Sequence, residues 1–89
     1  NISTEVKSNL WLRSELEERL YRDLLDLRHK IAIQHKASHH AILSDRSIYE
    51  IVLNKPATLK SLANIYGIGQ AKLSKFGDNI VNLVKNYKL

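Results

Sequence analysis

Residues 62–77 read Leu-Ala-Asn-Ile-Tyr-Gly-Ile-Gly-Gln-Ala-Lys-Leu-Ser-Lys-Phe-Gly, and this stretch decides how the chain is expected to fold. The pattern predicts a short helix, a tight turn and a second helix. Gly67 and Gly69 lie in the turn, because glycine reaches backbone angles that other residues disfavour. Ile65 and Ile68 flank the first glycine and are expected to anchor the turn in an apolar core.

The start of the second helix in this stretch is a candidate anion site. Gly69 opens that helix, whose first N–H groups have no acceptor within the helix. Such an end attracts anions, phosphate above all. Lys72 and Lys75 follow on the same helix, one turn apart. Together these features indicate a helix-hairpin-helix type of phosphate-binding turn, whereas Gly67 and Gly69 alone would also fit a plain connecting turn.

The composition is that of one small domain. The chain has 89 residues, enough for a single modest core. It contains no cysteine, which excludes disulfides and thiolate metal sites. No apolar run approaches the roughly 20 residues of a membrane span, so no membrane contact is predicted. The start lacks the pattern of a secretory signal. Because the first residue is Asn rather than Met, we expect a fragment of a longer protein.

The net charge of +5 is distributed unevenly. Residues 1–45 carry seven basic and seven acidic side chains, whereas residues 46–89 carry seven basic and two acidic ones. The whole excess therefore falls in the half that holds the glycine turn. A local positive field favours a polyanionic partner, although a solvated lysine-rich surface is the simpler alternative.

A long first helix is predicted from Ser14 to about Lys36. Ser14 and Glu17 have the spacing of a capping box. The apolar face comprises Leu16, Leu20, Leu24, Leu27 and Ile31. Residues 1–13 are expected to form an N-terminal extension or linker, in which Trp11 packs on the first helix; stacking on a base is its alternative role.

Four shorter helices are expected after it, and no strand. The predicted limits are Ser44 or Asp45 to Pro56, Thr58 to Ile65, Gly69 to Gly77, and Asp78 or Asn79 to Tyr87. The apolar faces are Ile48, Ile51, Val52 and Leu53; Leu59, Leu62, Ala63 and Ile65; and Ile80, Val81, Leu83, Val84 and Tyr87. The sequence thus predicts an all-α, compact five-helix bundle over residues 14–89.

Histidines cluster where the first helix is expected to end. His35 and His39 are four residues apart, a spacing at which two histidines on a helix can share a metal, and His40 follows. No third ligand is evident. We therefore predict a polar loop with a partial positive charge rather than a metal site.

The groups that catalysis needs are not brought together by the sequence. There is no glycine-rich loop of the type that holds ATP phosphates and no carboxylate cluster for two-metal chemistry. Asp23 and Asp26 are expected to face solvent on the first helix. Ser38 and His39 are adjacent, but nothing orients them as nucleophile and base. We predict no catalytic residue in this domain.

Several segments resemble the HRDC domain (helicase and RNase D C-terminal). Residues 20–32, Leu-Tyr-Arg-Asp-Leu-Leu-Asp-Leu-Arg-His-Lys-Ile-Ala, resemble its first helix, and residues 42–48, Ile-Leu-Ser-Asp-Arg-Ser-Ile, resemble the following loop and helix. Residues 55–62 and 65–77 resemble the remainder. The resemblance covers about residues 17 to 87 and is greatest to the version found in bacterial RecQ-family DNA helicases.

This resemblance implies an accessory, non-catalytic module of a RecQ-family DNA helicase that acts in DNA repair and recombination. The implied partner is single-stranded or junction DNA, with the helicase core as a possible intramolecular one. ATP and Mg are expected only in that core, and no cofactor is expected here. A monomer in the bacterial cytoplasm, associated with the nucleoid, is also implied.

The resemblance also points to one position before the second helix. In the bacterial RecQ version, an aromatic residue there contributes to binding single-stranded DNA, and His40 occupies that position here. Histidine can stack on a base or contact phosphate. Two prolines often precede this position in the family, where this chain has Ser38 and His39.

The leading hypothesis is weak, sequence-tolerant binding of DNA through phosphate contacts. The predicted nucleic-acid-binding residues are Lys36, His39, His40, Lys55, Lys60, Gly67, Gly69, Lys72 and Lys75. A protein-docking or regulatory module is one alternative, supported by the neutral, charge-laced first helix. RNA binding within an RNase D-like exonuclease is the other.

Overall fold

The longest element is α1, which spans Ile2–His35. The computed structural model describes the backbone of residues 2–87 and the side chains of residues 15–87. Leu20, Leu24 and Ile31 are buried, which confirms the predicted apolar face of this helix.

The start of α1 differs from the prediction. The backbone is already helical at Ile2, so Ser14 lies inside the helix rather than at its N-cap. Residues 2–13 contain neither glycine nor proline, and nothing in them interrupts the helix. The side chain of Trp11 lies outside the described residues, as does that of Ser14, so their predicted contacts stay predictions.

The end of α1 is close to the predicted one and takes the form of a Schellman motif. The N–H of Ala37 donates to the carbonyl oxygen of Ala32 at 2.9 Å, and that of Lys36 to Ile33 at 3.3 Å. Lys36 adopts a left-handed conformation with φ of 51°. Glycine usually occupies this position, so the sequence gives only a weak stop signal here.

The expected polar loop after α1 contains a short helix, α2, spanning His39–Ile42. The side chain of Ser38 caps it by accepting the N–H of Ala41 at 3.2 Å. Ile42 is buried and fixes α2 against the core. The prediction of a loop is wrong at this point because Ser38 is an effective N-cap.

Helix α3 spans Asp45–Asn54, with Ser44 as its N-cap, as predicted. It ends just before the buried Pro56, which confirms the predicted stop. Val52 is buried in the core, but its neighbour Leu53 is 66% exposed. The assignment of Leu53 to the apolar face is therefore wrong.

Helix α4 is a single turn spanning Leu59–Leu62, and Thr58 caps it as predicted. Of its predicted inner face, Leu62 and Ile65 are buried whereas Leu59 and Ala63 are exposed, so the assignment of these two is wrong. The chain then turns back and enters the last helix.

Helix α5 spans Gln70–Lys85 without a break. The sequence predicts an interruption at Gly77, and this prediction is wrong. Gly77 is buried, and a Cβ atom there would lie 2.7 Å from Cδ2 of Leu59 on α4. The glycine therefore allows two helices to approach closely rather than ending one of them. Within residues 2–87 the predicted number of five helices is confirmed: the sequence missed α2, but the two helices it predicted on either side of Gly77 are one helix, α5.

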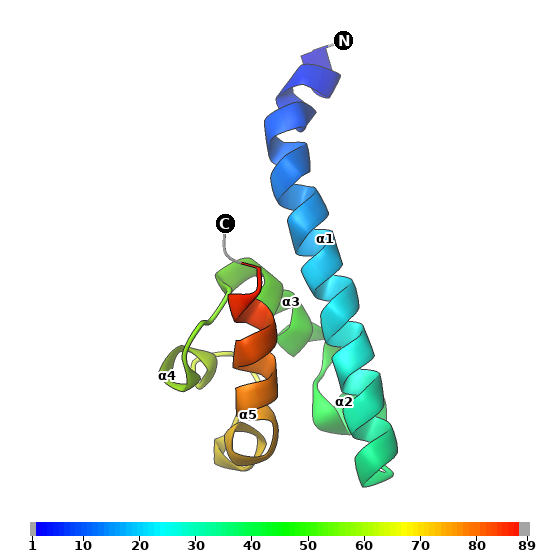
Figure 1. Cartoon of the computed structure of the whole chain (residues 1–89), viewed down its shortest axis with the longest axis vertical. Coiled ribbons are helices and arrows are strands. Elements are labelled where there is room, and N and C mark those ends of the chain that lie inside the picture. Colours follow the sequence, from blue (N-terminus) through cyan, green and yellow to red (C-terminus); the bar gives the residue numbers. More distant parts are fainter. Residues whose placement is uncertain (1, 88–89) are drawn as a thin grey trace.

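Helices α2 to α5 lie beside the C-terminal half of α1 (Figure 1). Helix α1 packs against α2, α3 and α5, and α4 packs on α5. One cluster of buried side chains includes Leu24 of α1, Ile48 of α3 and Ile80 of α5. Among residues 2–87 no helix is long and apolar enough to cross a membrane.

Two aspartates of α1 were expected to face solvent, and Asp23 is only partly exposed. Its carboxylate accepts a hydrogen bond from the hydroxyl group of Tyr87, so it ties α1 to the segment after α5. Asp26 is exposed, as expected.

Candidate nucleic-acid interface

The turn between α4 and α5 has the predicted anchors. Ile65 and Ile68 are buried, and the N–H of Ile68 donates to the carbonyl oxygen of Ile65 at 3.1 Å. Gly67 has φ of 77°, a conformation that side chains disfavour. A Cβ atom on Gly67 would also lie 2.9 Å from Oγ of Ser47 on α3. Backbone angle and limited space both require glycine at this position.

The second glycine of the turn has a different role. Gly69 is the N-cap of α5 and is in an extended conformation, with φ of −98°. A Cβ atom would meet nothing within 4 Å. Because any residue can adopt this conformation, glycine leaves the end of the helix open rather than shaping the turn.

The N-terminus of α5 carries the open donors that the sequence predicts. Gly69 provides no side-chain cap. The N–H of Leu73 donates to the carbonyl oxygen of Gly69 at 3.0 Å, which closes the first turn. The N–H groups of residues 70–72 precede this first bond of the helix and have no acceptor within the helix. This arrangement suits an anion.

A groove between α4 and α5 brings Lys60 to the same place. It has a volume of about 340 Å³ and is lined by both helices. Lys60 lines it from α4, and Gln70 from the first turn of α5. Lys72 is half-buried and Lys75 is exposed, and neither is among the described lining residues. Lys60 therefore shares a groove with the first turn of α5, whereas Lys72 and Lys75 are carried by α5 itself.

The second predicted region, around Lys36 and α2, is held together by its own contacts. Lys36 and His40 are exposed at this end of α1. His39 packs edge-on against His29 of α1, with Nε2 of His39 lying 3.1 Å from Nδ1 of His29.

The histidine whose spacing could have let it share a metal with His39 lies elsewhere. His35 ends α1, and its ring packs edge-on against Phe76 of α5, with ring centroids 5.4 Å apart. His35 and His39 therefore do not form a pair on one helix. Among residues 15–87, no group of three or more His, Cys, Asp or Glu side chains is arranged to hold a metal ion.

Lys55 is engaged in an ion pair within the fold. Its Nζ lies 2.7 Å from Oε2 of Glu17 on α1, and both side chains are only about a quarter exposed (21% and 26%). A phosphate contact would require breaking this pair. Lys55 is therefore not part of the proposed interface.

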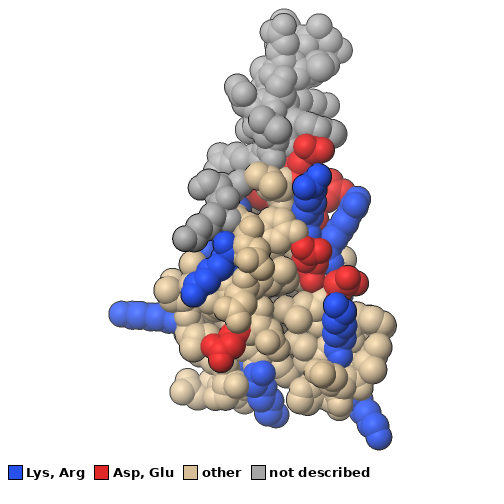
Figure 2. Space-filling view, in the orientation of Figure 1, with Lys and Arg blue, Asp and Glu red and all other residues tan. Residues whose placement is uncertain are grey.

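The basic side chains do not gather into a single patch on the face seen in Figure 2. Lysine and arginine side chains project from separate places along it, with uncharged surface and acidic side chains between them (Figure 2). On this face the local groupings described above matter more than the total charge.

A network of three residues next to the turn was not predicted as part of a site. The guanidinium carbon of Arg46 lies 4.0 Å from the ring centroid of Tyr66. Glu50 bonds to both residues, accepting from Nε of Arg46 at 3.2 Å and from the N–H of Tyr66 at 3.0 Å. The hydrogen bond from the Tyr66 N–H lowers the pKa of Glu50 the most, and the hydrogen bond from Arg46 lowers it further. The sequence offers only the spacing of Arg46 and Glu50 as a signal.

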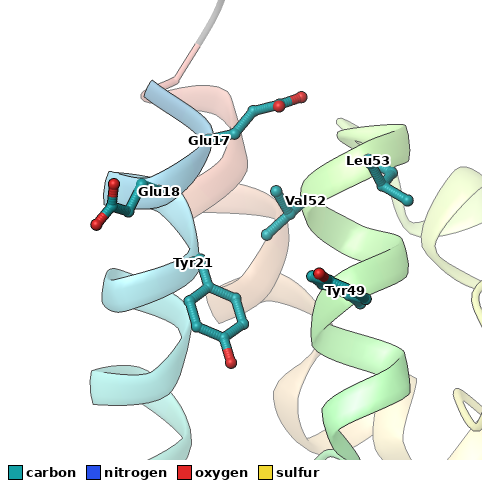
Figure 3. Close-up of a pocket in the computed structure, with 6 residues that line it drawn as sticks. All are labelled: Glu17, Glu18, Tyr21, Tyr49, Val52 and Leu53. Carbon is teal, nitrogen blue, oxygen red and sulfur yellow. The ribbon is translucent and has the colours of Figure 1, made fainter. Parts of the chain in front are cut away.

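A second surface lies between α1 and α3. Tyr21 and Tyr49 project into this space (Figure 3), with ring centroids 6.3 Å apart. A groove of about 380 Å³ is formed there by the two tyrosines, Glu17, Glu18, Val52 and Leu53. An adjoining hollow of about 490 Å³ adds Asp45 and Arg46 to the tyrosines. Carboxylates thus outnumber cations along this surface.

The helical fold and the glycine turn define a small helical module with an open helix end. A family model described as the HRDC domain matches residues 17–84, which include all of α2, α3 and α4. The chain therefore belongs to the HRDC domain family, whose members are accessory, non-catalytic modules that bind nucleic acid.

Proposed function

We propose that this chain is the accessory DNA-binding module of a RecQ-family DNA helicase. It holds single-stranded or junction DNA through the turn between α4 and α5. The observation that carries this proposal is the open N-terminus of α5, which lies on the same groove as Lys60. The buried anchors of the turn hold this end in place before any ligand arrives.

Phosphate groups are the chemical target of this site. Backbone N–H groups at the start of α5 and the ammonium groups of Lys60, Lys72 and Lys75 position a strand without reading its sequence. Such binding depends steeply on salt, because each neutralised phosphate releases counterions. Attached to a helicase, the module raises the local concentration of DNA at the core. ATP hydrolysis and its Mg belong to that core.

The exposed segment around α2 extends the contact surface. Lys36 and His40 are exposed and within four residues of each other in the chain. The family resemblance assigns strand contact to the position of His40. His39 contributes less in this proposal, because its ring is packed on His29.

An amide shift map of the 89-residue chain tests this function. We expect titration with an oligothymidylate to shift the amides of residues 67–75 and of His40, and raised salt to reverse the shifts. A parallel titration with oligouridylate distinguishes DNA from RNA. If neither strand shifts residues 67–75 at low salt, the proposed function is wrong.

Docking onto a protein is the second candidate function, and the groove between α1 and α3 favours it. Tyr49 and Leu53 are each 66% exposed there, and the lining residues include three carboxylates and one guanidinium. This chemistry fits an apolar protein segment that carries basic residues. A Leu/Lys peptide should shift the amides of Tyr21 and Tyr49, whereas the matched Leu/Glu peptide should not. Equal effects of the two peptides would contradict this candidate.

A further inference from the structure

We propose that Tyr66, together with Arg46, forms a base-stacking site for single-stranded nucleic acid. The inference rests on the proposed function and deepens it. It adds a place for a base beside the turn that is proposed to hold phosphate. Neither residue was identified as a site residue from the sequence.

The backbone of Tyr66 is fixed on both sides, although the residue is 50% exposed. Its N–H donates to Oε1 of Glu50 at 3.0 Å, and its carbonyl oxygen accepts from the hydroxyl group of Ser47 at 2.5 Å. Ile65 and Gly67 on either side are held by the core and by the turn. An exposed ring on such a backbone loses little conformational freedom when a ligand binds.

Arg46 places a cation over the ring of Tyr66. Its guanidinium carbon lies 4.0 Å from the ring centroid of Tyr66, within the range of a cation–π contact. The Arg46 side chain is 66% exposed, and Glu50 holds it at 3.2 Å. Bases stack on aromatic rings and on guanidinium planes, and each base has a flat face suited to both.

The choice of a nucleic acid as occupant follows from charge and position. Residues 46–89 carry the whole positive excess of the chain, seven basic against two acidic side chains. Tyr66 precedes the open start of α5 by only four residues. A ligand that offers a flat aromatic face and a phosphate in succession is a nucleotide strand.

The other exposed tyrosine provides a comparison within the same molecule. Tyr49 is 66% exposed, but it lies in the groove with Glu17, Glu18 and Asp45. These carboxylates pair with Lys55, Arg22 and Arg28, and Arg46 of the same hollow pairs with Glu50. Phosphate therefore meets no excess of positive charge at Tyr49, and a strand is not expected to bind there.

Anisotropy titrations of the 89-residue chain with a labelled oligothymidylate test the inference. The Tyr66→Leu variant should bind the oligothymidylate roughly 5- to 140-fold more weakly than the unchanged chain, because base stacking is lost. Tyr66→Phe should bind within about twofold of the unchanged chain, because the ring remains. Tyr49→Leu is the matched control and should leave the affinity unchanged. The hydrogen bonds of Tyr66 use only its backbone, so Tyr66→Leu and Tyr66→Phe keep its bonds with Glu50 and Ser47.

An abasic strand of the same length separates stacking from phosphate contact. The unchanged chain should prefer oligothymidylate over the abasic strand, and Tyr66→Leu should lose this preference. If the unchanged chain binds and Tyr66→Leu binds equally well, the stacking site is wrong while the proposed function stands. Equal losses in Tyr66→Leu and Tyr49→Leu would also overturn it. If the unchanged chain binds neither strand, the proposed function itself fails.

Discussion

Arg28 on α1 lies 2.9 Å from the carboxylate of Asp45 at the start of α3, and the two residues differ greatly in exposure. The Arg28 side chain is 9% exposed and that of Asp45 is 69%. The same guanidinium donates to the carbonyl oxygen of Leu43 at 3.0 Å. Arg28 thus fastens the segment between α2 and α3 to α1.

Replacing this arginine should destabilise the fold. Arg28→Leu keeps apolar bulk but leaves the buried carbonyl oxygen of Leu43 without its donor. We expect a loss of roughly 1–3 kcal/mol in the free energy of unfolding, measured by urea denaturation. Arg22→Leu is the control, because Arg22 is 72% exposed and pairs with Glu18 on the same helix. A similar stability for both variants would contradict this role of Arg28.

The ion pair also predicts how stability depends on pH. The hydrogen bond from Arg28 lowers the pKa of Asp45 below its ordinary value of 3.8. The contribution of the ion pair to the free energy of unfolding is complete above pH 3.8. It is lost as the pH falls through the lowered pKa of Asp45. Asp45→Asn should therefore be less stable than the unchanged chain at pH 7, and the difference should shrink below pH 3.8. Thermal unfolding at a series of pH values measures it, and a constant difference would be the contrary result.

The three glycines should respond differently to alanine. Gly67→Ala should destabilise the chain by about 1–2 kcal/mol or more, because φ is positive and the neighbouring Ser47 hydroxyl is held by its bond to Tyr66. Gly69→Ala should cost less, up to about 1 kcal/mol, since its Cβ meets open space and only the poorer N-cap preference of alanine remains. Denaturant unfolding of both variants tests this contrast, which fails if Gly69→Ala costs as much.

Gly77 poses a competition between helix propensity and packing. Alanine inside α5 should gain up to about 1 kcal/mol, while its Cβ would meet Cδ2 of Leu59 at 2.7 Å. That atom is the end of a flexible side chain that is 43% exposed, so it can move. We expect Gly77→Ala to be neutral or slightly stabilising in urea denaturation and Gly77→Val to be destabilising. A large loss in the alanine variant would show that Leu59 is fixed.

Sequence reasoning succeeded where the signal is local. Ser44 and Thr58 as N-caps, the stop before Pro56 and the anchored turn at Gly67 depend on residues within a few positions of each other. The prediction at Gly77 failed because glycine is usually a helix breaker, and the presence of Leu59 beside it is a fact of tertiary packing.

The candidate site could be predicted only in outline for the same reason. The open start of α5 follows from Gly69 and the helix pattern. In contrast, Lys55 pairs with a residue 38 positions away, and Tyr66 bonds to one 16 positions away. Such pairs depend on how the helices pack. The sequence therefore does not distinguish a lysine or tyrosine that is engaged within the fold from one that is available to a ligand.

The groove between α4 and α5 predicts which lysine matters for DNA. Lys60→Glu should weaken binding of an oligothymidylate and lower the slope of log affinity against log salt by at least about 1. Lys85→Glu changes the net charge equally but lies in the last turn of α5, at the opposite end from Gly69. The slope for Lys85→Glu should stay near that of the unchanged chain. Equal slopes for the two variants would show that only total charge matters.

The contact between Tyr87 and Asp23 should make the fold sensitive to alkali. The hydrogen bond to Asp23 raises the pKa of Tyr87 above its ordinary value of 10.0, so the folded state favours the protonated phenol. The contribution of this hydrogen bond to the free energy of unfolding is complete below pH 10.0. It is lost as the pH rises through the raised pKa of Tyr87. Tyr87→Phe should therefore be less stable at pH 7, and its difference from the unchanged chain should diminish above pH 10.0. Denaturant unfolding at both pH values measures this, with Tyr49→Phe as a control that should show no such convergence, and a gap that persists in alkali would exclude the bond as its cause.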